Sequence, residues 1–292
     1  MSERYPIIAI TGSSGAGTTS VTRTFENIFR REGVKSVVIE GDSFHRYDRA
    51  EMKIKMAEAE RTGNMNFSHF GEENNLFREL EGLFRSYSEA GTGMHRHYLH
   101  SPEEAAPFGQ EPGTFTQWEP LPEDTDLLFY EGLHGGVVTD EVNVARYPNL
   151  LIGVVPVINL EWIQKLWRDK KQRGYSTEAV TDTILRRMPD YVNYICPQFS
   201  RTHVNFQRVP CVDTSNPFIA REIPAPDESM VVIRFANPKG IDFQYLLSMI
   251  HDSFMSRANT IVVPGGKMEL AMQLIFTPFV LRMMERRKRA TQ

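Results

Sequence analysis

A glycine-rich stretch near the N-terminus constrains the fold of this chain more than any other part of its sequence. A mostly apolar run, predicted to be a strand from about Tyr5 to Ile10, leads into it, and a helical pattern of apolar residues begins inside it at about Thr18. The stretch consists of Gly12, Ser13, Ser14, Gly15, Ala16, Gly17, Thr18 and Thr19. Glycines let the backbone turn tightly, so that N–H groups and a helix N-terminus can face an anion. We therefore predict a buried strand, an anion-binding loop and a helix in direct succession.

The spacing of these glycines is typical of the phosphate loop of P-loop nucleotide-binding proteins. In such a loop Thr19 stands where a hydroxyl normally binds Mg²⁺. Thr18 departs from the pattern, because a lysine normally follows the last glycine. The loop is therefore an ordinary turn that binds no triphosphate, or another element supplies the missing cation.

The composition is that of a globular protein and excludes several other classes. A chain of 292 residues with 41% hydrophobic residues can bury a large core in one or two domains. The net charge of −4 argues against a dedicated nucleic-acid-binding protein. With only two cysteines, Cys196 and Cys211, a disulfide scaffold is excluded. Because we find neither a membrane-spanning run nor a secretory signal, we expect a cytoplasmic protein with no membrane partner.

Acidic residues follow or end two further runs that are predicted to be buried strands. The run Ser36–Glu40 is followed by Asp42, and the run Asp126–Gly132 contains Glu131. In an open parallel sheet the carboxyl ends of the strands line the ligand crevice, so both acids should stand beside the loop. Glu131 would then hold Mg²⁺ or its water. Asp42 is a functional acid, or an ordinary turn or N-cap residue.

The rest of the pattern is that of an α/β protein. Further strands are predicted at 150–158, 207–213, 230–235 and 260–263, and helices at 18–32, 160–173, 177–188, 241–254 and 267–289. We predict a P-loop NTPase-like fold with a mixed, mainly parallel sheet flanked by helices. Residues 1–292 are expected to form one domain, with a lid or excursion at about 43–123.

The excursion contains two features with open alternatives. A charged helical segment at 48–61 is a solvated face, or a lid that brings Arg49 or Lys53 to a substrate phosphate. The alternating segment 94–100 puts His95 and His97 on one face, where they would be able to chelate a metal. Because no cysteine or carboxylate completes a ligand set, we expect no metal site there.

The predicted helix at 160–173 carries charges of alternating sign at intervals of four. Glu161, Lys165, Asp169 and Arg173 therefore share one face. The simpler interpretation is a ladder of salt bridges. The functional alternative is that Lys165 supplies the cation that Thr18 lacks.

Taken together, these segments resemble the bacterial form of the phosphoribulokinase family, nearly from end to end. The most specific matches are the loop 12–19, the segment Glu40–Arg46 and the segment Phe129–Gly135. Val155–Lys165 and the segment 213–221, which ends in Arg221, add to the resemblance. Thr18 also resembles the bacterial enzymes, so it no longer argues against triphosphate binding.

The resemblance implies transfer of the γ-phosphoryl group of ATP to O1 of ribulose 5-phosphate, with Mg²⁺, in the Calvin cycle. It makes Asp42 the catalytic base, Lys165 and Asp169 catalytic residues, and Glu131 the acid on the Mg²⁺ side. Loop residues Gly12 to Thr19 would bind ATP. The residues it assigns to the sugar phosphate are His45, Arg49, Tyr98, His100, Arg168 and Arg173.

The resemblance also implies a form of regulation. Ala16 occupies the position of a regulatory cysteine in the plant enzymes, so disulfide switching of that type is not expected. The bacterial enzymes resemble NADH-activated homo-oligomers, and Arg31, Arg234 and Arg257 match their effector-site arginines. Two alternatives stay open: a uridine or pantothenate kinase on the same fold, and a nucleotide-sensing module without turnover.

Overall fold

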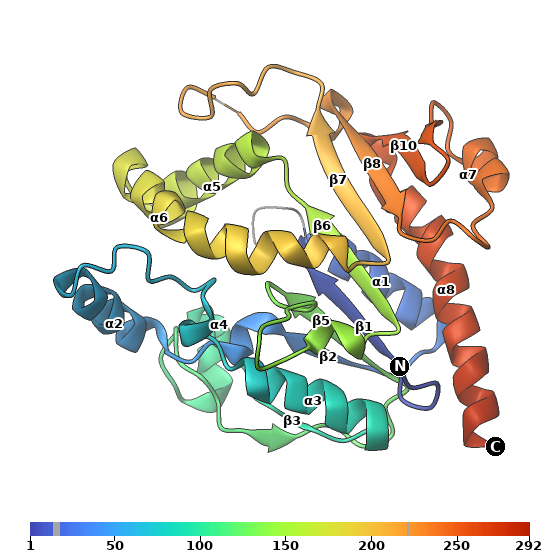
Figure 1. Cartoon of the computed structure of the whole chain (residues 1–292), viewed down its shortest axis with the longest axis horizontal. Coiled ribbons are helices and arrows are strands. Elements are labelled where there is room, and N and C mark those ends of the chain that lie inside the picture. The colour runs from blue at the N-terminus through green and yellow to red at the C-terminus, as the bar shows by residue number, and fades with distance from the viewer. Residues whose placement is uncertain (14–17, 221) are drawn as a thin grey trace.

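An eight-stranded sheet forms the centre of the molecule (Figure 1). The computed structural model describes residues 1–13, 18–220 and 222–292, with the backbone alone for residues 19, 172 and 173. The strand order is β2-β5-β1-β6-β7-β8-β10-β9. The bounds are β1 Ile7–Thr11, β2 Ser36–Glu40, β5 Leu127–Gly132, β6 Leu150–Val155, β7 Val204–Pro210, β8 Ser229–Phe235, β9 Phe254–Arg257 and β10 Thr260–Pro264. The first five strands in this order are parallel and the last three are added antiparallel, which confirms the predicted mixed sheet.

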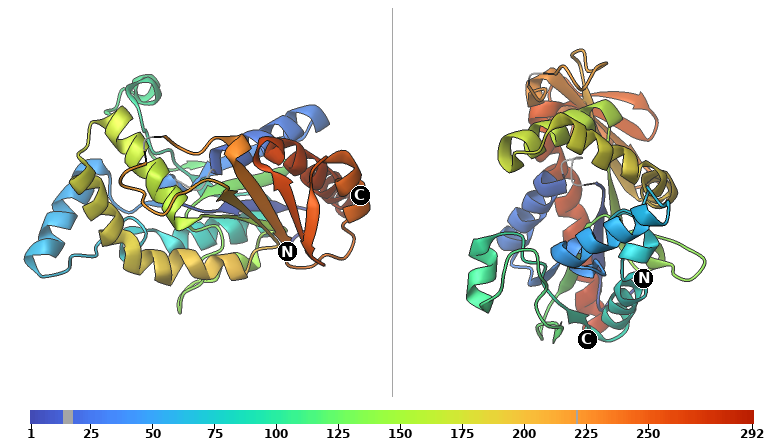
Figure 2. Two further views of the ribbon diagram at one scale, coloured as in Figure 1. Left: turned by 90° about the horizontal axis from the view of Figure 1, so that it is seen from above. Right: turned by 90° about the vertical axis from the view of Figure 1, so that its left-hand side faces the viewer.

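Helices cover both faces of this sheet and extend beyond its edge (Figures 1 and 2). Their bounds are α1 Thr18–Glu32, α2 Arg49–Arg61, α3 Phe77–Ala90, α4 Pro102–Ala105, α5 Ile158–Arg173, α6 Thr177–Asp190, α7 Phe243–Met249 and α8 Met268–Thr291. A second, two-stranded sheet pairs β3, Met94–His95, with β4, Glu119–Pro120. Among the described residues, no helix combines the length and apolar character that a membrane span requires.

The alternation of side chains along β1 divides the core into two halves. Ile8 and Ile10 belong to the cluster packed by α1 and α8, whereas Ile7 and Ala9 belong to the cluster packed by α3. All four are fully buried because a parallel strand covered on both faces alternates between two apolar layers. In the first cluster Phe25 lies 4.8 Å from Phe276, measured between ring centroids. Burying one such ring contributes about 1.5–3 kcal/mol.

Several predicted boundaries shift in the structure for local reasons. The strand predicted at 150–158 ends at Val155, because α5 already begins at Ile158. The strand predicted at 207–213 is β7, which begins three residues earlier at Val204. The helix predicted at 241–254 is only α7, since Asp252 adopts a left-handed conformation with φ of 64° and turns the chain into β9.

The excursion at 43–123, described throughout, adds no strand to the eight-stranded sheet. Its helix α2 lies with α5 and α6 on one side of the molecule, while α7 and α8 lie on the other (Figure 1). An ion pair between Arg186 of α6 and Glu60 of α2 links the two elements. The excursion thus rests against the helices that follow β6, beyond the carboxyl ends of the parallel strands.

Candidate active site

The carboxyl ends of β1, β2 and β5 bring the predicted acids together. Glu131 of β5 pairs in register with Ile10 of β1 on one side and with Glu40 of β2 on the other. Because β5 lies between the other two strands, Glu131 is the acid next to the loop, and Asp42 lies one strand farther away than predicted. Burial raises the pKa of Glu131, and a hydrogen bond from the Thr18 hydroxyl offsets part of that rise.

The start of the glycine-rich loop is fixed by close packing. A Cβ on Gly12 would lie 2.8 Å from the carbonyl oxygen of Val154, so only glycine fits beside β6. Ser13 donates a hydrogen bond to the carboxylate of Glu161 in α5, a contact that the sequence did not predict. Ser14, Gly15, Ala16 and Gly17, together with the side chain of Thr19, lie outside the described residues.

A pocket opens beside this loop. Its lining includes Ser20 of α1, Val154 of β6, Glu161 and Gln164 of α5, and Arg208 of β7. The pocket therefore lies where helix α1 begins and where parallel strands end, which is the usual place for a nucleotide in this class of fold.

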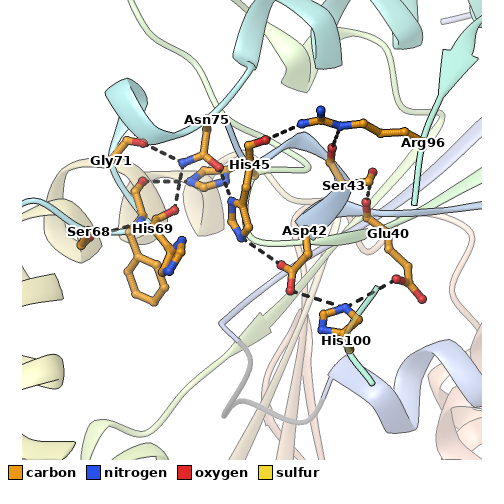
Figure 3. A network of polar contacts seen from close by, with 12 residues as sticks. Glu40, Asp42, Ser43, His45, Ser68, His69, Gly71, Asn75, Arg96 and His100 are labelled. Atoms are coloured by element: carbon orange, nitrogen blue, oxygen red, sulfur yellow. Dashed lines mark hydrogen bonds and ion pairs between the residues drawn. The ribbon is translucent and has the colours of Figure 1, made fainter. Parts of the chain in front are cut away.

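Asp42 stands at the centre of a polar network on a 3₁₀ turn, Gly41–Phe44, that directly follows β2 (Figure 3). His45 Nε2 lies 3.3 Å from Asp42 Oδ1, and His100 Nε2 lies 3.9 Å from Asp42 Oδ2. The Asp42 side chain is still 43% exposed, so a substrate hydroxyl can reach it. Gly41 permits this geometry, because a Cβ there would meet the Cα of Gly132 at 2.7 Å.

The amide of Asn75 fixes the protonation of His45. Asn75 Nδ2 donates to the carbonyl oxygens of His69 and Gly71, at 2.9 and 2.6 Å, so its Oδ1 faces His45 (Figure 3). That oxygen lies 2.9 Å from His45 Nδ1, which must therefore carry a proton. A second proton on Nε2 is then needed for a favourable contact with the Asp42 carboxylate. The arrangement therefore favours His45 as an imidazolium.

The pKa directions agree with this assignment. Burial by itself raises the pKa of Asp42, but the hydrogen bond from His45 and the charges of His45 and His100 outweigh it and hold that pKa below its usual value. Burial by itself lowers the pKa of His45, but the contacts with Asp42 and Asn75 raise it overall. The neighbouring His69 behaves oppositely, since burial and the charge of His45 lower its pKa to about 3.

The Asp42–His45 pair should stabilise the fold within a defined pH window. Because the pKa of Asp42 is lowered in the folded state, its contribution to the stability of the fold is present above about pH 4 and is lost as the pH falls. His45 has a raised pKa, so its contribution is complete below about pH 6.5 and is lost as the pH rises through that raised pKa. In urea titrations, the difference in unfolding free energy between wild type and His45→Gln should shrink at alkaline pH. A difference that stays constant across the titration would contradict the assigned imidazolium.

Lys165 and Asp169 form a close pair on α5. Lys165 Nζ lies 2.6 Å from Asp169 Oδ2, and Arg168 Nε lies 3.3 Å from Asp169 Oδ1. Burial and the charge of Arg187 lower the pKa of Lys165 to about 8. The predicted ladder is not continued by Glu161, whose hydrogen bonds go to Ser13 and Tyr191 instead. The side chain of Arg173 lies outside the described residues.

Two arginines hold the segment around His100 near Asp42: Arg96 contacts the Asp42 turn, and Arg49 of α2 contacts His100 itself. Arg96 donates from Nε to the carbonyl oxygen of Ser43 at 2.8 Å and from Nη2 to that of His45 at 2.6 Å (Figure 3). Arg49 Nη2 donates to the carbonyl oxygen of His100 at 3.2 Å. The rings of Tyr98 and His100 lie 4.8 Å apart. Of the residues assigned to the sugar phosphate, His45, Arg49, Tyr98 and His100 thus lie together near Asp42.

The three arginines predicted to bind an effector lie away from this site. Arg234 of β8 and Arg257 of β9 are both register partners of Thr260 in the intervening strand β10. Arg31 of α1 donates to Thr277 of α8 and pairs with Glu32. Within the described residues, no hydrogen bond or ion pair joins Arg31 to the other two.

The premise that no carboxylate accompanies His95 and His97 is wrong. Glu119 lies opposite His95 in the β3–β4 pair, and its carboxylate approaches both histidines. Local pattern could not reveal Glu119, because it lies more than twenty residues farther along the chain and only the turn of the excursion brings it back. Within the alternating segment 94–100, only Met94–His95 forms a strand.

Comparisons with known proteins agree with the sequence resemblance. A model of the family described as "Phosphoribulokinase / Uridine kinase family" matches residues 7–215. The chain is 97% identical to the chromosomal phosphoribulokinase of Cupriavidus necator over 292 residues, all of both chains. It is 71% identical to the phosphoribulokinase of Nitrobacter vulgaris, covering 99% of this chain and 100% of that protein. Among solved structures, it is similar to a phosphoribulokinase from Rhodobacter spheroides, with a TM-score of 0.91, 60% identity, and coverage of 98% and 100%.

Proposed function

Because this chain belongs to the phosphoribulokinase/uridine kinase family, we infer that it transfers the γ-phosphoryl group of ATP to O1 of ribulose 5-phosphate. The products are ADP and ribulose 1,5-bisphosphate, the CO₂ acceptor of the Calvin cycle. The observation that carries this inference is the similarity to phosphoribulokinases over the whole chain. Cationic and hydrogen-bonding groups gathered around an accessible carboxylate support it, since a sugar phosphate needs both.

Asp42 is the residue that orients the attacking hydroxyl and accepts its proton. Phosphoryl transfer passes through a loose transition state, in which the nucleophile needs positioning more than strong deprotonation. A carboxylate whose pKa is held low by His45 suits that task, because it stays ionised over the physiological pH range. Asp42 Oδ1 contacts His45, so Oδ2, on the His100 side, is the oxygen that can accept the hydrogen bond of O1.

The glycine-rich loop, Glu131 and Lys165 bind and neutralise the phosphate groups of ATP. The half-buried carboxylate of Glu131 at a strand end, beside a threonine hydroxyl, offers the oxygen ligands that suit Mg²⁺. Thr19 and Glu131 would hold that ion, which supplies positive charge to the phosphate oxygens. Lys165, paired with Asp169, supplies the second positive charge that Thr18 cannot provide.

Arg49 and His45 should act mainly on the sugar phosphate. Removing one charge-assisted contact costs roughly 1.5–3 kcal/mol, so Arg49→Ala and His45→Ala should each raise KM for ribulose 5-phosphate about 10–150-fold. The KM for ATP should change much less. Arg61→Ala, an exposed arginine at the end of the same helix α2, is the matched control and should behave like wild type. Equal increases in both KM values would indicate general damage to the fold.

Acceptor specificity separates this function from its alternatives. A nucleoside or pantothenate needs no phosphate clamp, and a nucleotide-sensing module releases no ADP. We would measure ADP release with MgATP alone and then with ribulose 5-phosphate, uridine or pantothenate. Release that depends on ribulose 5-phosphate is expected. Release with uridine or pantothenate instead would assign the chain to another branch of the family.

NADH activation of a homo-oligomer is the regulatory part of the proposal. Arg234 and Arg257 lie on the two strands that flank β10, where both are register partners of Thr260. A guanidinium can form two parallel hydrogen bonds to a pyrophosphate, which suits both arginines to this ligand. Arg31 lies on a different element, so the site would be completed between subunits. A ligand activates only by binding the active state more tightly than the inactive state.

Removing one effector arginine should therefore weaken activation without lowering the fully activated rate. Arg31→Ala and Arg257→Ala should raise the NADH activation midpoint roughly tenfold or more, by loss of a charge-assisted contact. The exposed Arg286→Ala on α8 is the control. The midpoint is measured by titrating NADH at fixed ATP and ribulose 5-phosphate. Unchanged midpoints in both variants, or a wild-type rate indifferent to NADH, would reject the assignment.

A further inference from the structure

Three side chains at the small β3–β4 sheet converge on one point. His95 and Glu119 face each other in register, and His97 lies two residues beyond His95, just after β3 ends. His95 Nε2 lies 3.5 Å from Glu119 Oε1, and His97 Nε2 lies 3.7 Å from the same oxygen. One potential ligand atom from each of the three residues can be chosen so that all three lie within 4.8 Å of one another.

The distances from the two histidines to Glu119 fit the spacing of ligands around one metal ion better than the length of hydrogen bonds. Separations of 3.5 and 3.7 Å are longer than the usual 2.7–3.2 Å of N–H···O hydrogen bonds. Two ligands of one tetrahedral Zn²⁺, each about 2.0–2.1 Å from the ion, lie about 3.3 Å apart. The separations of the two histidines from Glu119 are therefore within a few tenths of an ångström of those around one ion.

The backbone holds this arrangement before any ion arrives. His97 N–H donates to Thr116 Oγ1 at 2.9 Å, and Thr116 N–H donates to the His97 carbonyl oxygen, also at 2.9 Å. Arg96, between the two histidines, turns its guanidinium the other way, onto Ser43 and His45. The positively charged guanidinium of Arg96 therefore stays out of the cluster of His95, His97 and Glu119.

We propose that His95, His97 and Glu119 form a binding site for a divalent transition-metal ion of the Zn²⁺ type. Two imidazoles and one carboxylate suit Zn²⁺, whereas Mg²⁺ prefers six oxygen ligands. The His97 and Glu119 side chains are 45% and 55% exposed, so the ion can enter and water can complete the coordination.

An ion at this site would stabilise the segment that leads to the active site. It would tie β3 to β4, and the same segment continues from His97 through Tyr98 to His100 beside Asp42. A ligand that binds the folded state alone raises its stability by mass action. Saturating Zn²⁺ should therefore raise the melting temperature of the protein by several degrees.

The direct test is calorimetric titration of Zn²⁺ into the metal-free full-length chain without nucleotide. One ion per chain is expected. Because loss of an outer-shell partner alone costs about 10–100-fold, His95→Gln and Glu119→Gln should weaken binding by roughly 100-fold or more. The exposed His251→Gln is the matched histidine control and should bind like wild type, as should Asp42→Asn. Co²⁺ used as a coloured probe should give a visible spectrum that Zn²⁺ abolishes and excess Mg²⁺ leaves intact.

The outcomes separate this site from the catalytic centre. Equal binding by wild type and Glu119→Gln would overturn the proposal, as would the absence of binding by wild type. Binding that is lost in Asp42→Asn but kept in Glu119→Gln would assign the ion to the active site and equally overturn it. Circular dichroism of each variant checks folding, and Glu119, being largely exposed, can be replaced by its isosteric amide without opening the core.

Discussion

The Asp42→Asn variant is expected to lose turnover while it still binds ATP. Asparagine keeps the shape of the side chain but cannot accept the proton of O1, and its amide cannot pair with the His45 imidazolium. Loss of a general base lowers the rate roughly 10²–10⁴-fold, and loss of the shared positioning role would add to that. Turnover is measured as ADP release with saturating ribulose 5-phosphate, and ATP binding by calorimetry.

A matched control keeps this result specific. Asp140→Asn changes an exposed aspartate in a loop far along the chain and should leave kcat unchanged. An Asp42→Asn variant that retains more than about a tenth of the wild-type kcat would show that Asp42 is a turn residue rather than the base.

The Lys165→Met variant is expected to show a severe loss of kcat while the protein stays folded. Methionine keeps much of the apolar stem of lysine, and Arg168 still lies beside Asp169. If Lys165 served only as part of a salt ladder, its removal would lower the stability by up to roughly 3–5 kcal/mol, because the pair is buried, and would leave activity near normal. Melting temperature and kcat, measured on one preparation, separate the two accounts.

The pH profile gives a second test of Lys165. Its pKa is lowered to about 8, so the cation is present below that pH and is lost above it. Because kcat/KM reports the free enzyme, kcat/KM for ATP should fall as the pH rises through about 8. Lys165→Arg, whose charge persists, should move this alkaline limb upward. An alkaline limb that is unchanged in Lys165→Arg would contradict the proposed role.

Residues at the ends of buried strands were the most predictable part of the site. The apolar runs before Gly12, Asp42 and Glu131 predicted strands, and the parallel sheet then placed their ends at one edge. The sequence did not give the strand order, because pairing partners of a parallel strand are set by packing rather than by local pattern. The insertion of β5 between β1 and β2 was therefore missed.

Residues that act through distant partners were not predictable from local pattern. Asn75 fixes the protonation of His45 from thirty residues away, and Glu119 completes the His95–His97 cluster only through the β3–β4 pairing. Periodicity places a residue on a face of its own element, but it carries no information on which other element covers that face. Helix α5 shows the same limit, since a spacing of four predicted a ladder in which Glu161 does not take part.

The product of the reaction tests the central claim most directly. The full-length chain is incubated with MgATP and ribulose 5-phosphate, and the phosphorylated sugar is identified by phosphorus NMR alongside a count of the ADP formed. We predict one new phosphate ester on O1 of the sugar for each ADP released, and no ADP without the sugar phosphate. ADP release without a sugar product, or a phosphate on another hydroxyl, would contradict the proposed function.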